Sequence, residues 1–222
     1  MARPRADNHD QQRQTIRHQA AREFARRGYA SASMSDLARA CSVSKAALYH
    51  YFDSKESILF EALDQYMCRL QTLAHSHQGT ATRPGETSAQ AARNQLAALI
   101  RALLAEYAHS HNYHVCLLND VKFLGPDQSE HITSLERDVV NTIAQLIDKA
   151  FPGRIEPSVR SATTMALLGM VNFTFAWWKP DGELDEQQLA DLMIDLWWRG
   201  LDTGQDRLRQ DLGAAEGRSA SA

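Results

Sequence analysis

Apolar residues recur along this chain at spacings of three and four, the period of a helix with one buried face. In the first such segment, residues 10–27, Ile16, Ala20 and Phe24 lie four positions apart while arginines occupy the other faces. Gly28 ends the segment, because glycine most easily adopts the left-handed conformation that closes a helix. The sequence has no strand-like alternation of useful length, so the pattern predicts an all-α fold.

Two short helices are predicted next, over residues 34–40 and 45–51, with only four residues between them. Ser33 and Asp36 have the spacing of a capping pair at the start of the first helix. Ser44 is placed to cap the second helix. Two short helices joined by a tight turn are what a helix-turn-helix requires, so this segment is the first candidate for function.

Six further helices bring the predicted number to nine. Asp53 and Ser54 cap a long connecting helix that runs to about residue 77, and breakers mark a loop over residues 79–88. The helical period then returns in five segments, at about residues 96–107, 115–123, 135–147, 157–178 and 184–201. Residues 209–222 are small and polar, and we expect them to form a disordered tail.

The composition is that of an ordinary globular protein, with 44% apolar and 23% charged residues. No apolar run approaches the roughly eighteen residues of a membrane span, and the N-terminus lacks the apolar segment of a signal peptide. We therefore expect a cytoplasmic protein. The cysteines lie far apart, which favours reduced thiols over a disulfide framework; they are Cys41, Cys68 and Cys116.

Charge is divided unevenly along the chain. Residues 1–60 carry a net charge of +4 and the remainder carries −7, within a total of −3. A basic N-terminal block on an acidic body suits the binding of a polyanion at one end. The predicted helix-turn-helix lies inside this basic block, which makes DNA the natural partner.

The two short helices also have the residues needed to pack and to contact DNA. Small and apolar side chains would pack them against Phe24 and Ala20 of the first helix; these are Leu37, Ala38, Val43 and Leu48. The second helix would present outward, at a spacing that enters a major groove, Lys45, Ala46, Tyr49 and His50. Lys45 is the best candidate for base readout, most naturally of guanine O6 and N7.

At this point a resemblance appears. From about Thr15 to Leu63 the chain resembles the DNA-binding domain of the TetR/AcrR family of regulators. The matching motifs, all in register, are A-R-E-F-A-R-R-G-Y, M-S-D-L-A, V-S-K-A-A-L-Y-H-Y-F and S-K-E. The resemblance implies a dimeric, all-helical transcriptional regulator, with a helix-turn-helix domain over residues 1–53 and a ligand-binding and dimerisation domain over residues 54–208.

The resemblance also implies roles for individual residues. The helix that the family places in the major groove carries, in this chain, Ser44, Lys45, Ala46, Tyr49 and His50. Family members usually use the residue at Tyr49 to contact a phosphate or a thymine methyl group. Lys55, at the start of the connecting helix, typically donates to phosphate with help from the helix N-terminus. Ser33 is a second candidate phosphate contact.

Some neighbouring residues have competing interpretations. Two aromatic residues are favoured as core packing over DNA contacts, namely Tyr51 and Phe52. Three arginines of the first helix are favoured as a solvated face over DNA contacts, namely Arg22, Arg26 and Arg27. Two arginines on an N-terminal arm are candidates for a minor groove, namely Arg3 and Arg5.

The last two predicted helices are apolar on more than one face, which exceeds what one small core buries. A two-fold helical interface would cover the surplus. In the TetR family the final two helices form such a dimer interface, so resemblance and composition agree. A homodimer also suits a palindromic operator, because each half-site takes one helix-turn-helix.

The middle helices are expected to enclose a small-molecule effector. The residues that we expect to line its site are Leu103, Tyr107, Asn119, Lys122, Phe123, Asn172, Phe173 and Trp177. Leu103 and Tyr107 have core packing as the favoured alternative, whereas an asparagine inside an apolar helix needs a partner.

The segments 117–124 and 172–201 resemble one branch of the family, whose members respond to acyl-CoA thioesters in the breakdown of fatty acids, steroids and phenylacetate. That resemblance implies an acyl-CoA effector, with phenylacetyl-CoA as the first candidate. CoA carries phosphates, so its site should offer a cation, for which the candidates are Arg93, Arg101, Lys122 and Arg137.

These observations predict a ligand-responsive repressor in which the effector shifts the connecting helix and lowers the affinity for DNA. The main alternative is a multidrug-sensing repressor of an efflux pump with a broad aromatic pocket; a ligand-free architectural DNA binder is a further one. An enzyme is not expected, because the sequence has no nucleophile–base pair or glycine-rich phosphate loop at a usable spacing. No cofactor or metal is expected either, because the histidine spacings do not match helical zinc sites.

Overall fold

The computed structural model describes residues 4–78, 85–179 and 181–201 of the 222-residue chain. All regular structure in these residues is helical, which confirms the predicted all-α class. The expected tail, residues 209–222, lies outside the described residues. Among the described residues, no helix combines the length and apolar character that crossing a membrane requires.

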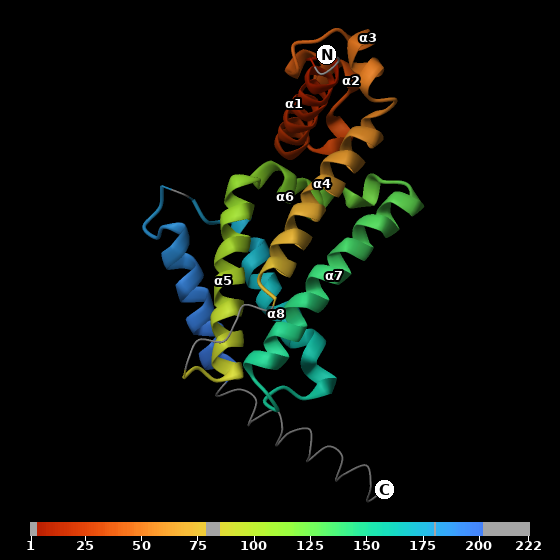
Figure 1. Ribbon diagram of the computed structural model, residues 1–222. Helices are drawn as coiled ribbons and strands as arrows, with labels where there is room; N and C mark the ends of the chain where they lie inside the picture. The colour runs from red at the N-terminus through yellow and green to blue at the C-terminus, as the bar shows by residue number, and fades with distance from the viewer. Residues whose placement is uncertain (1–3, 79–84, 180, 202–222) are drawn as a thin grey trace, which may run out of the picture. The chain divides into compact units, whose positions relative to one another are not determined.

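Nine α-helices are formed by the described residues, the number predicted from the pattern (Figure 1). The first four are α1 Pro4–Arg27, α2 Met34–Ala40, α3 Lys45–Tyr51 and α4 Lys55–Ser76. The next four are α5 Ser88–His109, α6 His111–Asp120, α7 Pro126–Ala150 and α8 Arg160–Asn172. A last helix follows over residues 186–201. Short 3₁₀ turns stand at Tyr29–Ser31, Val121–Phe123, Pro157–Val159 and Phe173–Ala176.

The two short helices begin and end at the predicted residues, because their caps form. The Ser33 hydroxyl accepts a hydrogen bond from the Asp36 backbone N–H at 3.2 Å, and the Asp36 carboxylate accepts one from the Ser33 N–H at 3.1 Å. The Ser44 hydroxyl accepts from the Ala47 N–H at 3.0 Å. These bonds satisfy N–H groups that a helix N-terminus leaves without intrahelical partners.

The predicted end of α8 was wrong. The α-helix stops at Asn172 rather than continuing to Trp178, and a 3₁₀ turn takes its place. Thr174 is the physical reason: its hydroxyl donates to the Val171 carbonyl at 2.8 Å, and its own carbonyl accepts from the N–H of both Trp177 and Trp178. Threonine beside two aromatic residues has low helix propensity, so the local hydrogen bonds prevail.

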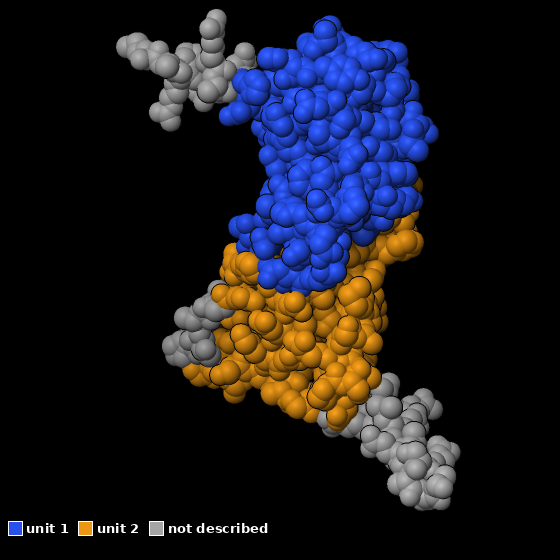
Figure 2. All heavy atoms as spheres, turned by 90° about the vertical axis from the view of Figure 1, so that its right-hand side faces the viewer, with its two compact units in different colours: residues 1–72, 109–138 blue, residues 73–108, 139–222 orange. Residues whose placement is uncertain are grey.

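The chain divides into two compact units, coloured separately in Figure 2. Unit 1 contains residues 1–72 and 109–138, and unit 2 contains residues 73–108 and 139–222. The core of unit 1 holds the first three helices together around fully buried side chains, among them Ile16, Phe24, Leu37 and Leu48. The core of unit 2 is built from α5, α7, α8 and the last helix, with buried Leu96, Ile100, Ile147, Leu167 and Ala190.

Candidate nucleic-acid interface

The outward face of α3 has the character expected of a DNA-contacting helix. Its exposed side chains are Ser44, Lys45, Ala46, Tyr49 and His50. Leu48, on the opposite face, is fully buried, whereas Tyr49 is 45% exposed. The Lys45 ammonium lies 5.9 Å from the centre of the Tyr49 ring. The seven residues therefore separate into one anchoring side and one side that is free to meet a partner.

A partly buried ion cluster holds the C-terminal end of α3. Arg13 of α1 donates to the Tyr51 carbonyl at 2.9 Å and to the Glu61 carboxylate of α4 at 2.9 Å. The same guanidinium lies 4.4 Å from the centre of the Phe52 ring. Arg17 of α1, which is buried, donates to the Glu61 Oε1 atom, which also accepts from Arg13. One guanidinium thus joins α1, α3 and α4.

Sequence reasoning missed this cluster, although one signal was present. Glu61 stands three residues after Ile58 and two before Leu63, within the apolar stripe of α4. Burial alone would raise the pKa of Glu61, but the hydrogen bonds from Arg13 and Arg17 outweigh it and leave the pKa below its ordinary value. An acidic residue inside an apolar stripe therefore indicated a buried cationic partner.

Lys55 lies at the start of α4, as predicted, but its ammonium makes internal contacts. It donates to the Tyr29 carbonyl at 2.7 Å and to the Ala32 carbonyl at 2.8 Å. The same nitrogen lies 4.0 Å from the centre of the Tyr29 ring. Burial lowers the pKa of Lys55. The expected phosphate contact remains a prediction, and it requires the ammonium to leave or share two carbonyl groups.

The other candidate residues around α3 differ in their exposure and in their hydrogen-bond or ion-pair partners. Ser33 is exposed at the N-terminus of α2, where its hydroxyl serves the cap. Phe52 is buried, in agreement with a packing role. Arg26 and Arg27 both pair with Glu23, at 2.9 and 3.4 Å. The N-terminal arm predicted for Arg5 was wrong, because α1 begins at Pro4 rather than near residue 10 and so includes Arg5. The side chain of Arg5 lies outside the described residues, and so does the whole of Arg3.

The structure joins two of the expected ligand residues. Tyr107 of α5 is buried, and its hydroxyl donates to the Asn172 side-chain oxygen at 2.9 Å. Burial raises the pKa of Tyr107. Leu103 lies one helical turn earlier in α5 and is also buried. Leu103 and Tyr107 therefore lie in the interior of unit 2, and the Tyr107 hydroxyl has Asn172 as a hydrogen-bond partner.

The other expected ligand residues are exposed. Phe173 and Trp177 are 61% and 54% exposed, and they line an open apolar groove of about 520 Å³ in unit 2. Three more lie in unit 1 and are also exposed, namely Asn119, Lys122 and Phe123. The Asn119 amide donates to the Val115 carbonyl at 2.9 Å. The hydrogen-bond partner expected for this asparagine is therefore the backbone of its own helix.

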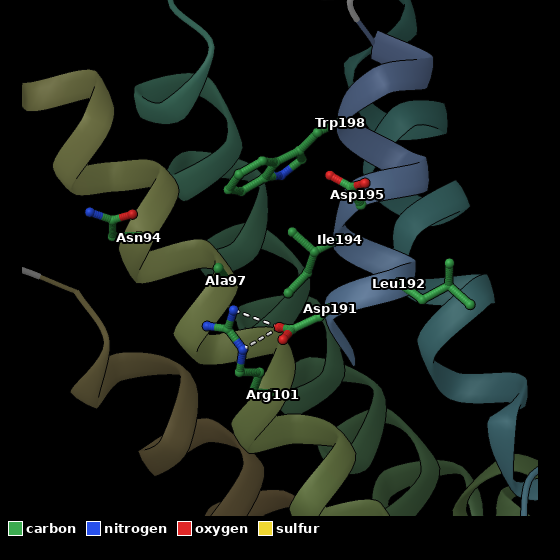
Figure 3. Close-up of a pocket in the computed structure, with 8 residues that line it drawn as sticks. All are labelled: Asn94, Ala97, Arg101, Asp191, Leu192, Ile194, Asp195 and Trp198. Carbon is green, nitrogen blue, oxygen red and sulfur yellow. Dashed lines mark hydrogen bonds and ion pairs between the residues drawn. The ribbon is translucent and has the colours of Figure 1, made fainter. Parts of the chain in front are cut away.

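A second groove of unit 2, of about 690 Å³, lies between α5 and the last helix. In Figure 3, Arg101 of α5 and Asp191 of the last helix point toward each other, and the Arg101 Nε donates to the Asp191 carboxylate at 2.7 Å. The Trp198 ring extends from the last helix toward α5 (Figure 3). Its buried Nε1 has no hydrogen-bond partner among the described residues. This groove therefore contains an ion-paired arginine and a tryptophan whose indole N–H is buried.

One histidine of unit 1 lies in the interior. His114 is buried, and its Nδ1 lies 3.1 Å from the Tyr66 hydroxyl. In the part of the chain that the structure describes, no three His, Cys, Asp or Glu side chains come together as a metal site.

Comparisons with known proteins agree with this architecture. Residues 16–62 match the model of the bacterial regulatory proteins of the tetR family. Residues 89–201, more than half of the chain, match the tetracyclin repressor-like C-terminal domain. The chain belongs to the TetR family.

Individual relatives of this TetR-family regulator extend the finding. YuxN of Bacillus subtilis (strain 168), an uncharacterized HTH-type transcriptional regulator, is 46% identical over 43 residues, which is 19% of this chain and only 15% of YuxN. A TetR-family regulator from Bordetella parapertussis 12822 has a TM-score of 0.75 and 30% identity, over 83% of this chain and 93% of that one. AibR, solved with isovaleryl coenzyme A and operator DNA, has a TM-score of 0.72 and 26% identity, over 83% and 97%.

The match confirms the predicted order of an N-terminal helix-turn-helix domain and a C-terminal helical domain. The N-terminal family model ends at residue 62 and so includes Glu61 together with Arg17. The ion cluster that fixes α3 therefore lies almost wholly within the TetR-family DNA-binding segment.

The lowered pKa of Glu61 predicts how stability depends on pH. Because its pKa is depressed in the folded state, Glu61 stabilises the fold above its unfolded pKa of about 4.3, and this contribution is lost as pH falls through the folded value. In Glu61→Gln, the unfolding free energy should be lower by about 1–3 kcal/mol at pH 7, and its decline between about pH 5 and 3 should be shallower. Chemical denaturation at a series of pH values measures both effects.

The matched control is Glu130→Gln, because Glu130 forms an exposed ion pair with Arg137 at 2.7 Å in the same unit. Exposed pairs contribute about 0–1 kcal/mol, so this variant should follow the wild-type pH profile closely. Equal profiles for the two variants would contradict the role assigned to Glu61.

Proposed function

We propose that this TetR-family regulator is a ligand-responsive repressor that binds a palindromic operator as a homodimer and is released by an acyl-CoA thioester. The observation that carries the choice of DNA and an acyl-CoA as ligands is the likeness to AibR, which was solved in complex with isovaleryl coenzyme A and operator DNA. Phenylacetyl-CoA is the first effector to test, because the C-terminal sequence motifs resemble regulators that respond to it.

The exposed face of α3 supports operator binding. Lys45 has a flexible cationic side chain at the start of the helix, where it can donate to guanine O6 and N7. Tyr49, one turn later, is exposed and can contact a phosphate or a thymine methyl group. His50 and Ser44 lie at either end of the same face. Ala46 adds no hydrogen bond, so base readout rests mainly on Lys45.

An exposed apolar surface of unit 2 supports the homodimer. The side chains of this surface come from α8, the turn after it and the last helix, and are Met165, Phe173, Trp177, Leu192 and Leu196. Each is between 46% and 61% exposed, and four of the five border the apolar groove or stand in it. A second copy would remove these side chains from water, at a gain of roughly 25 cal/mol for each Å² buried.

The groove between α5 and the last helix is our candidate for the polar part of the effector. Arg101, one of the four cations expected near CoA phosphates, lines this groove. Arg93 instead donates to the Ala150 carbonyl at 3.0 Å and lies over the Phe151 ring. A phosphate would compete with Asp191 for the Arg101 guanidinium.

Release requires the effector to prefer one conformation of the regulator. A thioester bound in unit 2 would favour one conformation of the dimer. In that conformation, α4 of each subunit would hold the two helix-turn-helix segments at a separation unsuited to the operator. The difference in the effector's affinity for the two conformations of the regulator then sets how far the affinity for DNA falls.

A multidrug-sensing repressor of an efflux pump is the second candidate. The aromatic lining of the apolar groove, with Phe173 and Trp177, favours it, because flat aromatic surfaces bind many unrelated apolar cations. Such a protein would bind several organic cations at similar affinity and would not discriminate among thioesters.

Replacing Lys45 tests the assignment of base readout. Lys45→Ala should weaken binding to the selected operator by roughly tenfold or more and relax the preference at one base pair of each half-site. Selection of bound sequences from random DNA, followed by titration of the selected fragment, measures both. Lys149→Ala removes the same charge from an exposed position on α7 and should change neither. Equal losses on selected and scrambled DNA would reduce Lys45 to a phosphate contact.

Replacing Leu196 tests the dimer interface. Leu196→Glu should raise the dimer dissociation constant by at least about a hundredfold, because a lost leucine contributes about 1.5–3 kcal/mol and enters a two-fold interface twice. Sedimentation over a range of concentrations measures it. Leu118→Glu alters an exposed leucine of α6 in unit 1 and is the control. A dimer that tolerates the Leu196 change would place the interface elsewhere.

The decisive experiment is operator binding by the full-length dimer with phenylacetyl-CoA, isovaleryl-CoA, a long-chain acyl-CoA, free CoA or the free acids. One thioester should release the DNA, whereas free CoA and the acids should not. Arg101→Gln should reduce the response to that thioester and leave effector-free DNA binding unchanged. Arg160→Gln, which breaks another Arg–Asp pair of unit 2, is the matched control. DNA binding that no thioester disturbs would remove the acyl-CoA proposal and favour the drug sensor.

A further inference from the structure

The end of α6 contacts the turn between α1 and α2, within unit 1. We use "the α6–α7 corner" for residues 120–125, which join these two helices. The Phe123 ring stacks on the Tyr29 ring, with 4.9 Å between the ring centres and 27° between the planes. The Tyr29 backbone N–H favours the ionised form of the buried Asp120 carboxylate. Phe123 thus packs on the side chain of Tyr29, and Asp120 interacts with its backbone N–H.

Tyr29 stands where the chain passes from α1 to α2. It follows Gly28, whose φ of 82° ends α1, and it begins the 3₁₀ turn that leads to the cap of α2. Its carbonyl accepts from Lys55, and its ring also lies 5.1 Å from the Phe24 ring. The position of Tyr29 therefore fixes where α2 starts, and α2 in turn packs on α3.

The same corner is bonded to the first turn of α4. The Glu56 carboxylate accepts a hydrogen bond from the Gly125 N–H at 2.9 Å. A Cβ atom at Gly125 would lie 3.2 Å from that carboxylate oxygen, so the close approach favours glycine here. Lys55, the neighbour of Glu56, contacts Tyr29. The corner, the start of α4 and the α1–α2 turn form one set of hydrogen-bonded groups.

Asp120 is buried, unlike a solvated surface carboxylate. It is 5% exposed, and burial raises its pKa even though the Cys116 thiol, the Lys122 and Lys55 charges and the Tyr29 N–H favour its ionised form. A buried carboxylate is costly unless it is well bonded. The buried Asp120 carboxylate therefore depends on the polar groups around it, of which the Tyr29 N–H is one.

We propose that Phe123 and Asp120 are positioning residues for operator recognition: through Tyr29 they set the orientation of α2 and α3, so that a displacement of α6 reaches the DNA-contacting face. The proposal rests on the proposed operator binding. It gives Phe123 a role other than the ligand contact expected from the sequence. Because α6 also packs on α1, with the Cys116 thiol 3.5 Å from the Ala21 carbonyl, α6 and the helix-turn-helix are linked at more than one point.

The test compares Phe123→Ala and Asp120→Ala with a control on the same helix, Leu118→Ala, whose side chain is exposed and lies outside these contacts. In the full-length dimer, each corner variant should weaken binding to the selected operator by roughly three- to tenfold, the range of an aromatic pair or one hydrogen bond, and binding to scrambled DNA much less. Phe123→Tyr and Asp120→Asn keep the ring and the acceptor oxygen, so they should restore operator affinity.

A second measurement follows the contact itself. Amide hydrogen exchange at Tyr29, Ser31 and Ala32 should be faster in both alanine variants than in Leu118→Ala, while exchange in the helices of unit 2 stays unchanged. Corner variants that match the Leu118 control in both measurements would overturn the proposal. An equal loss on operator and scrambled DNA, together with lower thermal stability, would also overturn it, because it would show a structural role alone. A wild-type protein that selects no DNA sequence would overturn the proposed function, while the exchange difference would still decide whether Phe123 holds Tyr29.

Discussion

The hydrogen bonds of the Arg13 guanidinium are the interactions on which the surface proposed to contact DNA depends. A seven-residue helix such as α3 has too few internal hydrogen bonds to be stable alone, so its orientation must come from its neighbours. The buried Leu48 side chain anchors α3 in the core. The hydrogen bond from Arg13 to the Tyr51 carbonyl fixes the orientation of the end of α3. Glu61 keeps the guanidinium in place, because a half-buried cation without a counter-charge would be costly.

The helix pattern and the caps could be predicted because they are local. Ser33, Asp36 and Ser44 act within three residues, so sequence spacing alone fixed the bounds of α2 and α3. The Arg13–Glu61 cluster was missed because its partners are 48 residues apart, and spacing carries no information on such pairs. The end of α8 was wrong because the hydrogen bonds of Thr174 compete with a helix that the apolar pattern favoured.

The expected ligand residues also show that sequence does not identify the partner of a side chain. An asparagine in an apolar helix needs a partner, and Asn119 and Asn172 met this need differently: Asn119 donates to its own helix, whereas Asn172 accepts from Tyr107. Sequence indicates that such a side chain must be satisfied, but not by what. The aromatic residues Phe173 and Trp177 are equally ambiguous, because a pocket wall and a subunit interface both require apolar rings.

Lys55 combines internal hydrogen bonds with an expected contact to DNA. A lysine at a helix N-terminus beside a helix-turn-helix is typical of a phosphate contact, yet here its ammonium satisfies two carbonyl groups of the α1–α2 turn. The two roles are compatible if DNA offers a phosphate where the lysine leaves a carbonyl, since the free energy of one set of hydrogen bonds offsets the other. The α1–α2 turn would then be held by Lys55 in free protein and by Asp120 and Phe123 throughout. Any signal that reaches α6 therefore acts on the turn most strongly when Lys55 is engaged with DNA.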